Sequence, residues 1–264
     1  MRKLLPACLP LLLLCAFVAS AQRKPDREAA GLKGAVKSVR LEWARRTTKD
    51  GKTTESARRP QSVIVYDEQG DRIESTSFMY DGSVIFKTTY QRDAQGHMVQ
   101  TSYDGDGKLM RKTVQLVDRQ GKFVGFIFYG ANGELKQRSV ETRGANGRLL
   151  EEAVYDAGEK LLYRKVFTYD GQGEQTEYTV YGSSGNVTQK TVWLGGGSFH
   201  IVSYDERGNI QVESTNKASI REKLDSQGNW TEQHTPQKHT QNGHTEEFVG
   251  VTYRTIEYYP PKKQ

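Results

Sequence analysis

The stretch Tyr129-Gly130-Ala131-Asn132-Gly133-Glu134-Leu135 is one copy of a turn that recurs along this chain. Related copies, which share an aromatic residue and a glycine four positions later, begin at Tyr66, Tyr103, Tyr169, Tyr181 and Tyr204. Asp or Gly after the aromatic residue suits a turn, and the later glycine supplies a positive φ. Because a type I turn followed by a left-handed residue commonly closes a hairpin, we expect Tyr129 to lie opposite Leu135.

The glycines of every second turn recur at about 26 residues, as from Gly70 to Gly96 and from Gly147 to Gly173. The repeating unit is therefore two strands and two turns. With 35% hydrophobic and 27% charged residues and a mean hydropathy of −0.73, the chain is too polar for a thick core. We predict an all-β fold, an antiparallel meander of about fifteen short strands built from these double-hairpin repeats. An open curved sheet and a rolled shell both fit this pattern.

The first 21 residues have the features of a signal peptide. Arg2 and Lys3 precede an apolar run, and Ala19-Ser20-Ala21 resembles a cleavage site. The run is short for a membrane anchor, which needs about 20 residues, so we expect no transmembrane segment after cleavage. We predict an exported protein, periplasmic or extracellular, with a flexible lead at 22–33, one β-repeat domain at 34–259 and a tail at 260–264. The clearest repeats span 60–232.

Both cysteines, Cys8 and Cys15, lie in the predicted signal peptide, so the mature chain would lack disulfides and thiolate ligands. The large Leu14 before Cys15 argues against lipid anchoring there. Cleavage would remove Arg2 and Lys3 and lower the formal charge from +6 to +4. Because the remaining charge is spread along the chain, the sequence predicts no nucleic-acid partner.

No catalytic or metal-binding constellation emerges from the residue types that usually form one. The histidines are His97, His200, His234, His239 and His244. The last three are five residues apart, which suits neither a strand face nor a helix face. Asp104-Gly105-Asp106-Gly107 lacks the further oxygen ligands of a calcium loop, so a turn is the simpler interpretation. We expect no enzyme activity, no metal and no cofactor.

Five tyrosines precede alternate turns and are the candidate binding residues: Tyr103, Tyr129, Tyr155, Tyr181 and Tyr204. Alternate turns of a meander share one sheet edge, so these rings should form a row at about 10 Å spacing. Such a row could stack on a cell-envelope glycan or on a protein partner, and an edge strand could also capture a partner strand. The alternatives are a purely structural envelope or scaffold protein and a hydrolase or toxin-associated shell. The oligomeric state stays open.

The Tyr-Asp-x-x-Gly copies, together with Gly147-Arg148-Leu149-Leu150, resemble the YD-repeat (Rhs-type) family of bacterial extracellular β-repeat proteins. The resemblance covers roughly residues 60–232. It implies a spiral β-shell, a surface location and, in some members, carbohydrate binding. Large members enclose a C-terminal toxin domain, whereas we expect this chain to be a short member without one.

Overall fold

The computed structural model describes residues 24–119, 122–241 and 243–261, so the predicted signal peptide lies outside the described residues. The described part contains one four-residue helix, α1 (Asp26–Ala29), and 18 strands. The first nine are β1 (Val36–Lys49), β2 (Lys52–Glu55), β3 (Arg59–Tyr66), β4 (Arg72–Phe78), β5 (Val84–Arg92), β6 (Met98–Asp104), β7 (Leu109–Val117), β8 (Phe123–Gly130) and β9 (Leu135–Arg143). The others are β10 (Leu149–Asp156), β11 (Leu161–Tyr169), β12 (Gln175–Gly182), β13 (Val187–Gly195), β14 (Ser198–Tyr204), β15 (Ile210–Asn216), β16 (Ile220–Leu224), β17 (Trp230–Gln241) and β18 (His244–Tyr258).

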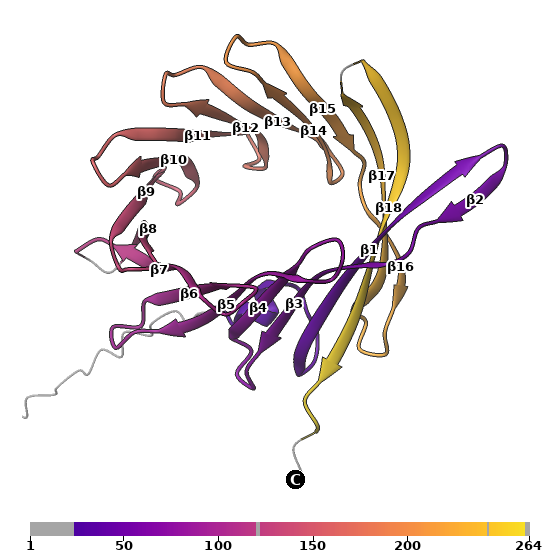
Figure 1. The fold of residues 1–264 in the computed structure, drawn as a ribbon, viewed down its shortest axis with the longest axis horizontal. Helices are drawn as coiled ribbons and strands as arrows, with labels where there is room; N and C mark the ends of the chain where they lie inside the picture. Colours follow the sequence, from indigo (N-terminus) through magenta and orange to yellow (C-terminus); the bar gives the residue numbers. More distant parts are fainter. Residues whose placement is uncertain (1–23, 120–121, 242, 262–264) are drawn as a thin grey trace, which may run out of the picture.

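Sixteen of these strands close into an antiparallel barrel, and β2 and β16 are additional. Strands β3 to β15 pair each with the next, β15 pairs with β17, and β17 pairs with β18. The ring closes at β1, which pairs with β18 on one side and with β3 on the other (Figure 1).

The all-β, antiparallel part of the prediction is confirmed, but the open curved sheet or rolled shell is wrong. The two ends of the sheet meet along a seam that runs from Val36 opposite Tyr258 to Arg46 opposite Val249. Accumulated strand twist brings distant strands together, and closure pairs N–H and C=O groups that an open edge would leave unpaired. A pattern of short hairpins does not reveal this closure, because the seam joins the first strand to the last.

The hairpin turns have the predicted register. Tyr129 lies opposite Leu135, and Tyr103 lies opposite Leu109, each beside a shift in register. Gly133 has a φ of 80°, and its N–H donates to the Gly130 carbonyl at 3.1 Å. The turn chemistry of the sequence therefore produces the local structure that it predicts.

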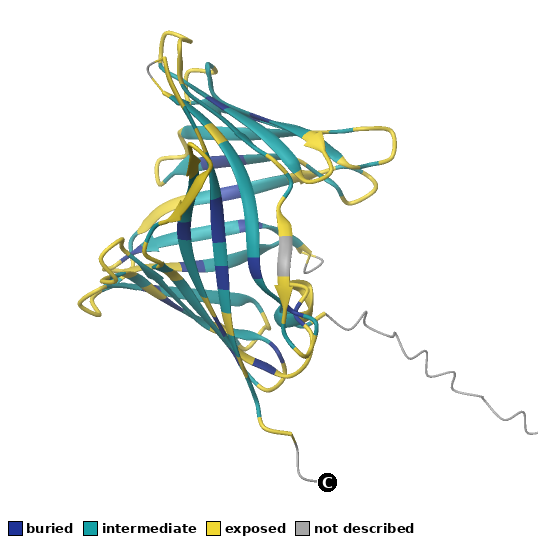
Figure 2. Ribbon diagram, turned by 90° about the vertical axis from the view of Figure 1, so that its right-hand side faces the viewer, coloured by how far each residue is buried: buried dark blue, intermediate teal, exposed yellow. Residues whose placement is uncertain are grey.

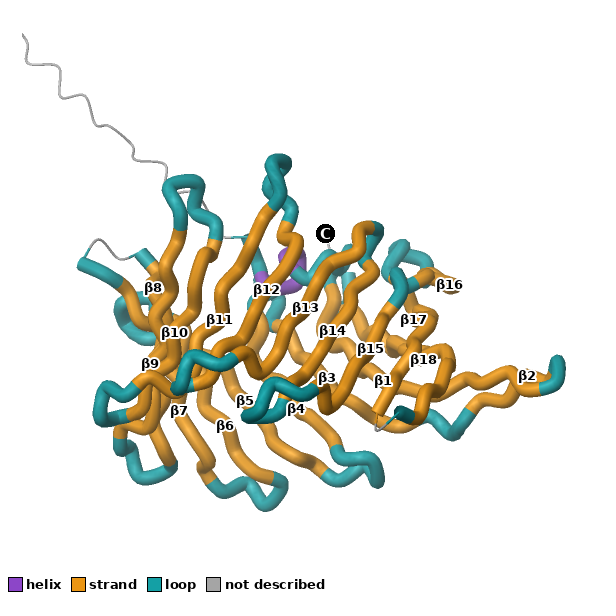
Figure 3. Tube along the Cα trace, turned by 90° about the horizontal axis from the view of Figure 1, so that it is seen from above, coloured by secondary structure: helices purple, strands orange, loops and turns teal. Residues whose placement is uncertain are grey.

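The polar, His- and Gln-rich stretch near the C-terminus forms part of the long hairpin β17–β18. Its register runs from Glu232 opposite Tyr253 to Gln241 opposite His244. The hairpin β1–β2 is a second extension, and it projects beyond the body of the barrel (Figure 3). No helix in the described ranges is long and apolar enough to cross a membrane.

The predicted flexible lead contains α1, which is tied to the barrel at the turn between β3 and β4. The Arg27 N–H donates to the Gly70 carbonyl at 2.8 Å, and the Arg72 N–H donates to the Asp26 carboxylate at 3.0 Å. These contacts bring Leu32 onto the cluster that contains Tyr66. Elsewhere, burial is limited to narrow bands across the strands, as expected for a wall one sheet thick (Figure 2).

Candidate functional site: the two faces of the barrel wall

Cross-strand pairing assigns each strand residue to one of two faces, because directly opposed residues point to the same side of a sheet. Phe126 lies opposite Ser139, which lies opposite Val154. Further along the ring, Phe167 lies opposite Tyr178, which lies opposite Thr191. The same register continues around the barrel. We call this side of the wall the aromatic face and the opposite side the charged face.

The aromatic face carries most of the ring-bearing side chains of the strands: Trp43, Phe86, Tyr90, Phe126, Phe128, Tyr163, Phe167, Tyr178, Trp193, Phe199 and Phe248. Several of these rings are in contact. The ring centroids of Phe167 and Tyr178 lie 5.9 Å apart, and those of Tyr178 and Trp193 lie 5.7 Å apart. Trp193 in turn lies opposite Phe199. A continuous apolar strip therefore crosses strands β11 to β14.

The charged face carries a series of ion pairs between neighbouring strands. Lys87 lies 2.7 Å from Glu74, and Lys190 lies 2.8 Å from Glu177. Similar pairs continue the series at Arg164–Glu151, His200–Glu213 and Lys238–Glu247. Such partly exposed pairs contribute about 0–1 kcal/mol each, so they characterise a solvated surface more than they stabilise it.

The aromatic face is the inner, concave one. Asp104 ends β6 on this face, and its main-chain N–H and C=O both bond to the turn that leads into β7. For L-residues in an extended strand, that bonding direction fixes the side of the sheet on which the Asp104 side chain lies. A line drawn straight across the strands runs from Ser102 to its partner Arg111 and on to Gly130, the last residue of β8. This line therefore moves steadily toward the end of the strands at which Asp104 also lies. With the usual sheet twist, a stagger in this direction makes the aromatic face the concave side of the wall.

Buried small polar residues are concentrated on the aromatic face, although Thr179 on the charged face is also covered. A belt of small polar residues near the middle of the aromatic face is almost fully covered: Thr88, Ser102, Thr113, Ser139 and Thr191. Side chains crowd together on the concave side of a curved wall, so larger neighbours cover the small ones. The Thr88 and Ser102 hydroxyls bond to one another at 2.9 Å, and the Phe126 N–H donates to the Ser139 hydroxyl at 3.1 Å.

The inside of the barrel offers space for a ligand. An eight-stranded barrel is filled by its own inward side chains, whereas barrels of about sixteen strands enclose more room than their side chains occupy. On the inner face, a cavity of 310 Å³ is lined by Arg92, Met98, Gln100, Gln115, Phe123 and Phe126. The rings of the aromatic face are only partly buried, so apolar surface remains available inside the barrel.

A strip of charge interrupts the inner aromatic lining. Lys165 donates to the Glu152 carboxylate at 3.1 Å, Glu152 lies opposite Glu141, and Arg143 donates to Glu141. Desolvation alone would lower the pKa of Lys165, but the hydrogen bond and charge of Glu152 outweigh it, and the pKa is raised. Lys165 therefore stays protonated although it is partly buried.

The five predicted tyrosines lie on the charged face, near the rim formed by alternate turns. Their cross-strand partners are aliphatic, as at Tyr103–Leu109 and Tyr204–Ile210. Arginines stack on two of the rings, with the Arg138 and Arg164 guanidinium carbons 4.6 Å from the ring centroids of Tyr155 and Tyr181. All five are partly buried. Their assignment as binding residues stays a prediction.

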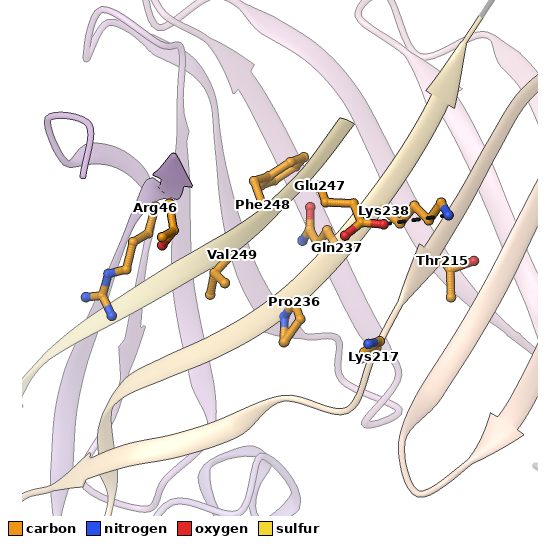
Figure 4. A pocket seen from close by; sticks show the side chains of 10 residues that line it. Arg46, Thr215, Lys217, Pro236, Gln237, Lys238, Glu247, Phe248 and Val249 are labelled. Carbon is orange, nitrogen blue, oxygen red and sulfur yellow. Dashed lines mark ion pairs between the residues drawn. The ribbon is translucent and has the colours of Figure 1, made fainter. Parts of the chain in front are cut away.

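A groove of 540 Å³ is lined by Arg46, Thr48, Thr215, Lys217, Pro236, Gln237, Lys238, Glu247, Phe248 and Val249 (Figure 4). Most of these side chains belong to the charged face. Lys238 lies 3.6 Å from Glu247, and Arg46 lies 2.7 Å from Glu55, so two of the cations are already paired. We therefore place the candidate site on the inner face rather than in this groove.

Metal chemistry has no support among the described residues, since no group of three His, Cys, Asp or Glu side chains there could hold an ion. His97 and His200 each lie 3.1 Å from one carboxylate, that of Asp93 and Glu213 respectively. These are isolated pairs on the wall rather than converging ligands.

Sequence reasoning missed the inner aromatic residues, although a signal for them exists. In the double-hairpin repeat, Tyr181 ends a strand at its turn, and Tyr178 lies three residues earlier, on the opposite face. Because side chains alternate between the faces of a strand, rings three residues apart lie on opposite faces, one outer and one inner. Which of the two faces is inward depends on closure, so the pattern alone does not identify the lumen.

No family model matches the sequence. No curated protein matches it either. Among solved structures, a porin-like protein from Bacteroides uniformis aligns with a TM-score of 0.47 at 11% identity, covering 85% of this chain and 98% of that chain. MucB in complex with MucA(peri) aligns with a TM-score of 0.15 at 10% identity, covering 83% and 88%. Both TM-scores lie below 0.5, so we base no conclusion about function on these similarities.

Proposed function

We propose that the protein is a non-enzymatic, exported barrel that binds an amphipathic ligand with an apolar chain, such as a fatty acyl chain, on its inner aromatic face. One observation carries this proposal: aromatic side chains lie inside a closed wall whose outer side is lined with ion pairs. A folded chain that places rings around enclosed space gains most when an apolar ligand covers them, because burial of apolar surface is favourable.

The outer surface supports a barrel that faces water. Charged side chains such as Glu177 and Lys190 lie on the outer side of the wall. A cation such as Lys190 would cost about 2–4 kcal/mol if it faced the centre of a lipid bilayer, and a carboxylate somewhat less. Membrane-spanning barrels have the reverse arrangement, with an apolar outer band and a polar lumen. An exported binding protein of this kind fits the predicted signal peptide, and it would shelter an acyl chain from water in the cell envelope.

Two tyrosines of β12 offer a matched test. Tyr178 lies on the inner face, and Tyr181 lies on the outer face of the same strand. We expect the mature protein to bind a fatty acid, detected by displacement of N-phenyl-1-naphthylamine. Tyr178→Ala should weaken binding about tenfold, which corresponds to losing one ring contact of about 1.4 kcal/mol, and Tyr181→Ala should leave it unchanged.

Both variants must first show the far-UV circular dichroism spectrum of the wild type. Absence of fatty-acid binding by the folded wild type would overturn the proposal. An equal loss in the two variants would move the site away from the inner face.

A second candidate is retention of an envelope glycan by the outer tyrosines, favoured by their shared rim and face. Ala substitution of Tyr103, Tyr129 and Tyr181 together is then expected to abolish retention on immobilised envelope polysaccharide, because the stacking surface is lost. The triple variant must be folded, since each lost cross-strand pair also costs about 0.2–1 kcal/mol. Unchanged retention by the folded variant would leave the row with a structural role only.

A further inference from the structure

The inner face carries a strip of charged residues that binding of an apolar chain alone would not require. Two carboxylates lie side by side with a cation at each end, across β9, β10 and β11: Arg143, Glu141, Glu152 and Lys165. Aromatic rings flank the strip on both sides, with Phe126 and Phe128 on β8 and Phe167 and Tyr178 on β11 and β12. A ligand chain that lies on either aromatic patch therefore ends beside these charges.

The strip is electrically balanced and partly open. Two cations and two anions give no net formal charge. The side chains of Lys165 and Glu152 are 34% and 24% exposed, so both can exchange part of their mutual contact for a ligand. Glu152 also lies opposite another carboxylate, Glu141, and like charges directly opposed on a sheet repel. A cationic group placed between these carboxylates would relieve that repulsion.

We propose that this strip holds the headgroup of the ligand, and that the headgroup is zwitterionic, with a phosphate and an amine as in phosphoethanolamine lipids. The inference rests on the proposed function, because it assigns the polar end of the same ligand. One of the two end cations, Lys165 or Arg143, donates to the phosphate, and Glu141 and Glu152 accept from the ammonium group, as charge-assisted hydrogen bonds. A purely anionic headgroup would leave the two carboxylates unmatched and close to its own charge.

The wall supplies a matched control on the same two strands. Arg164 donates to Glu151 at 3.1 Å, the same distance as between Lys165 and Glu152, and each residue is the direct neighbour of its inner counterpart. The pair Arg164–Glu151 lies on the outer face. A change at Glu151 therefore removes an equivalent cross-strand ion pair without touching the lumen.

The test compares lysophosphatidylethanolamine with lysophosphatidylglycerol of the same acyl chain, each below its micelle concentration, by titration calorimetry. We expect the wild type to bind the zwitterionic lipid about tenfold more tightly than the anionic one. Glu152→Gln should weaken binding of the zwitterionic lipid and strengthen binding of the anionic one. Glu151→Gln should change neither affinity. Free phosphoethanolamine should not compete, since the chain supplies most of the binding energy.

The outcomes separate the two proposals. If fatty acid and both lysophospholipids bind but headgroup and Glu152→Gln make no difference, the headgroup assignment is wrong and the apolar site stands. Equal shifts in Glu152→Gln and Glu151→Gln would also overturn it, because the outer pair cannot touch a luminal ligand. If no chain-bearing ligand binds the folded wild type, the proposed function itself fails.

Discussion

Replacement of Gly125 by alanine is expected to lower the free energy of unfolding by about 3 kcal/mol or more. Gly125 is buried in β8 and has a φ of 150°, a conformation that other residues rarely adopt. A Cβ atom there would lie 2.0 Å from the Ser139 carbonyl oxygen and 2.8 Å from its carbon. Both are main-chain atoms of the neighbouring strand β9, so the methyl group can fit only if two paired strands move apart.

The matched control is Gly133→Ala, at the turn that ends the same strand. Gly133 also has a positive φ, of 80°, but no atom of another residue beyond its chain neighbours lies within 4 Å of the place that a methyl group would take. Its cost is the left-handed conformation alone, about 1–2 kcal/mol. Urea unfolding followed by circular dichroism measures both values. Equal losses in the two variants would show that the contact with Ser139 does not decide the stability of β8.

Tyr66→Ala is expected to cost about 3–5 kcal/mol, the range for removal of a large buried aromatic side chain. Tyr66 is 1% exposed and packs with Leu32, Val36 and Val39 in one buried cluster, to which the segment after α1 contributes Leu32. Desolvation raises the pKa of its hydroxyl, which agrees with its buried position. Its loss would open a cavity where the first strand and the N-terminal segment meet.

Tyr103→Ala is the control, because Tyr103 occurs in the same Tyr-Asp-x-x-Gly motif. Tyr103 is only partly buried and lies opposite Leu109, so its replacement should cost about 0.2–1 kcal/mol, the range for one cross-strand pair. Thermal unfolding of the two variants gives the comparison. A loss at Tyr103 as large as that at Tyr66 would mean that the repeat tyrosines are energetically alike.

The contrast between Tyr66 and Tyr103 shows that the repeat motif predicts the turn but not the side of the wall on which its tyrosine lies. In both copies, Asp and Gly set the turn through local hydrogen bonds, as at Asp104, which accepts from the N–H groups of Asp106 and Lys108. Successive turns alternate between the two ends of the strands, however, so the same motif points its tyrosine inward at one end and outward at the other. The motif itself does not encode this difference.

The candidate site also combines features that the local sequence contains with features that depend on closure of the barrel. The alternation of ring-bearing and charged residues, as at Tyr178 and Glu177, is present in the sequence. The charge pairs across neighbouring strands also depend only on short-range register. Convergence of Phe126, Tyr178 and Lys165 on one enclosed space depends on sixteen strands and a seam, which no local pattern contains.

The sequence by itself determined the turns, the short strands and antiparallel order of β3 to β15, and the pairing of Tyr129 with Leu135. These features depend on interactions between residues fewer than about fifteen positions apart, which turn chemistry and alternation encode directly. Only the tertiary structure decided that the meander closes and which face is concave. Closure pairs Val39 with Ile256, residues at opposite ends of the chain, and it results from twist summed over the whole sheet rather than from any single hairpin.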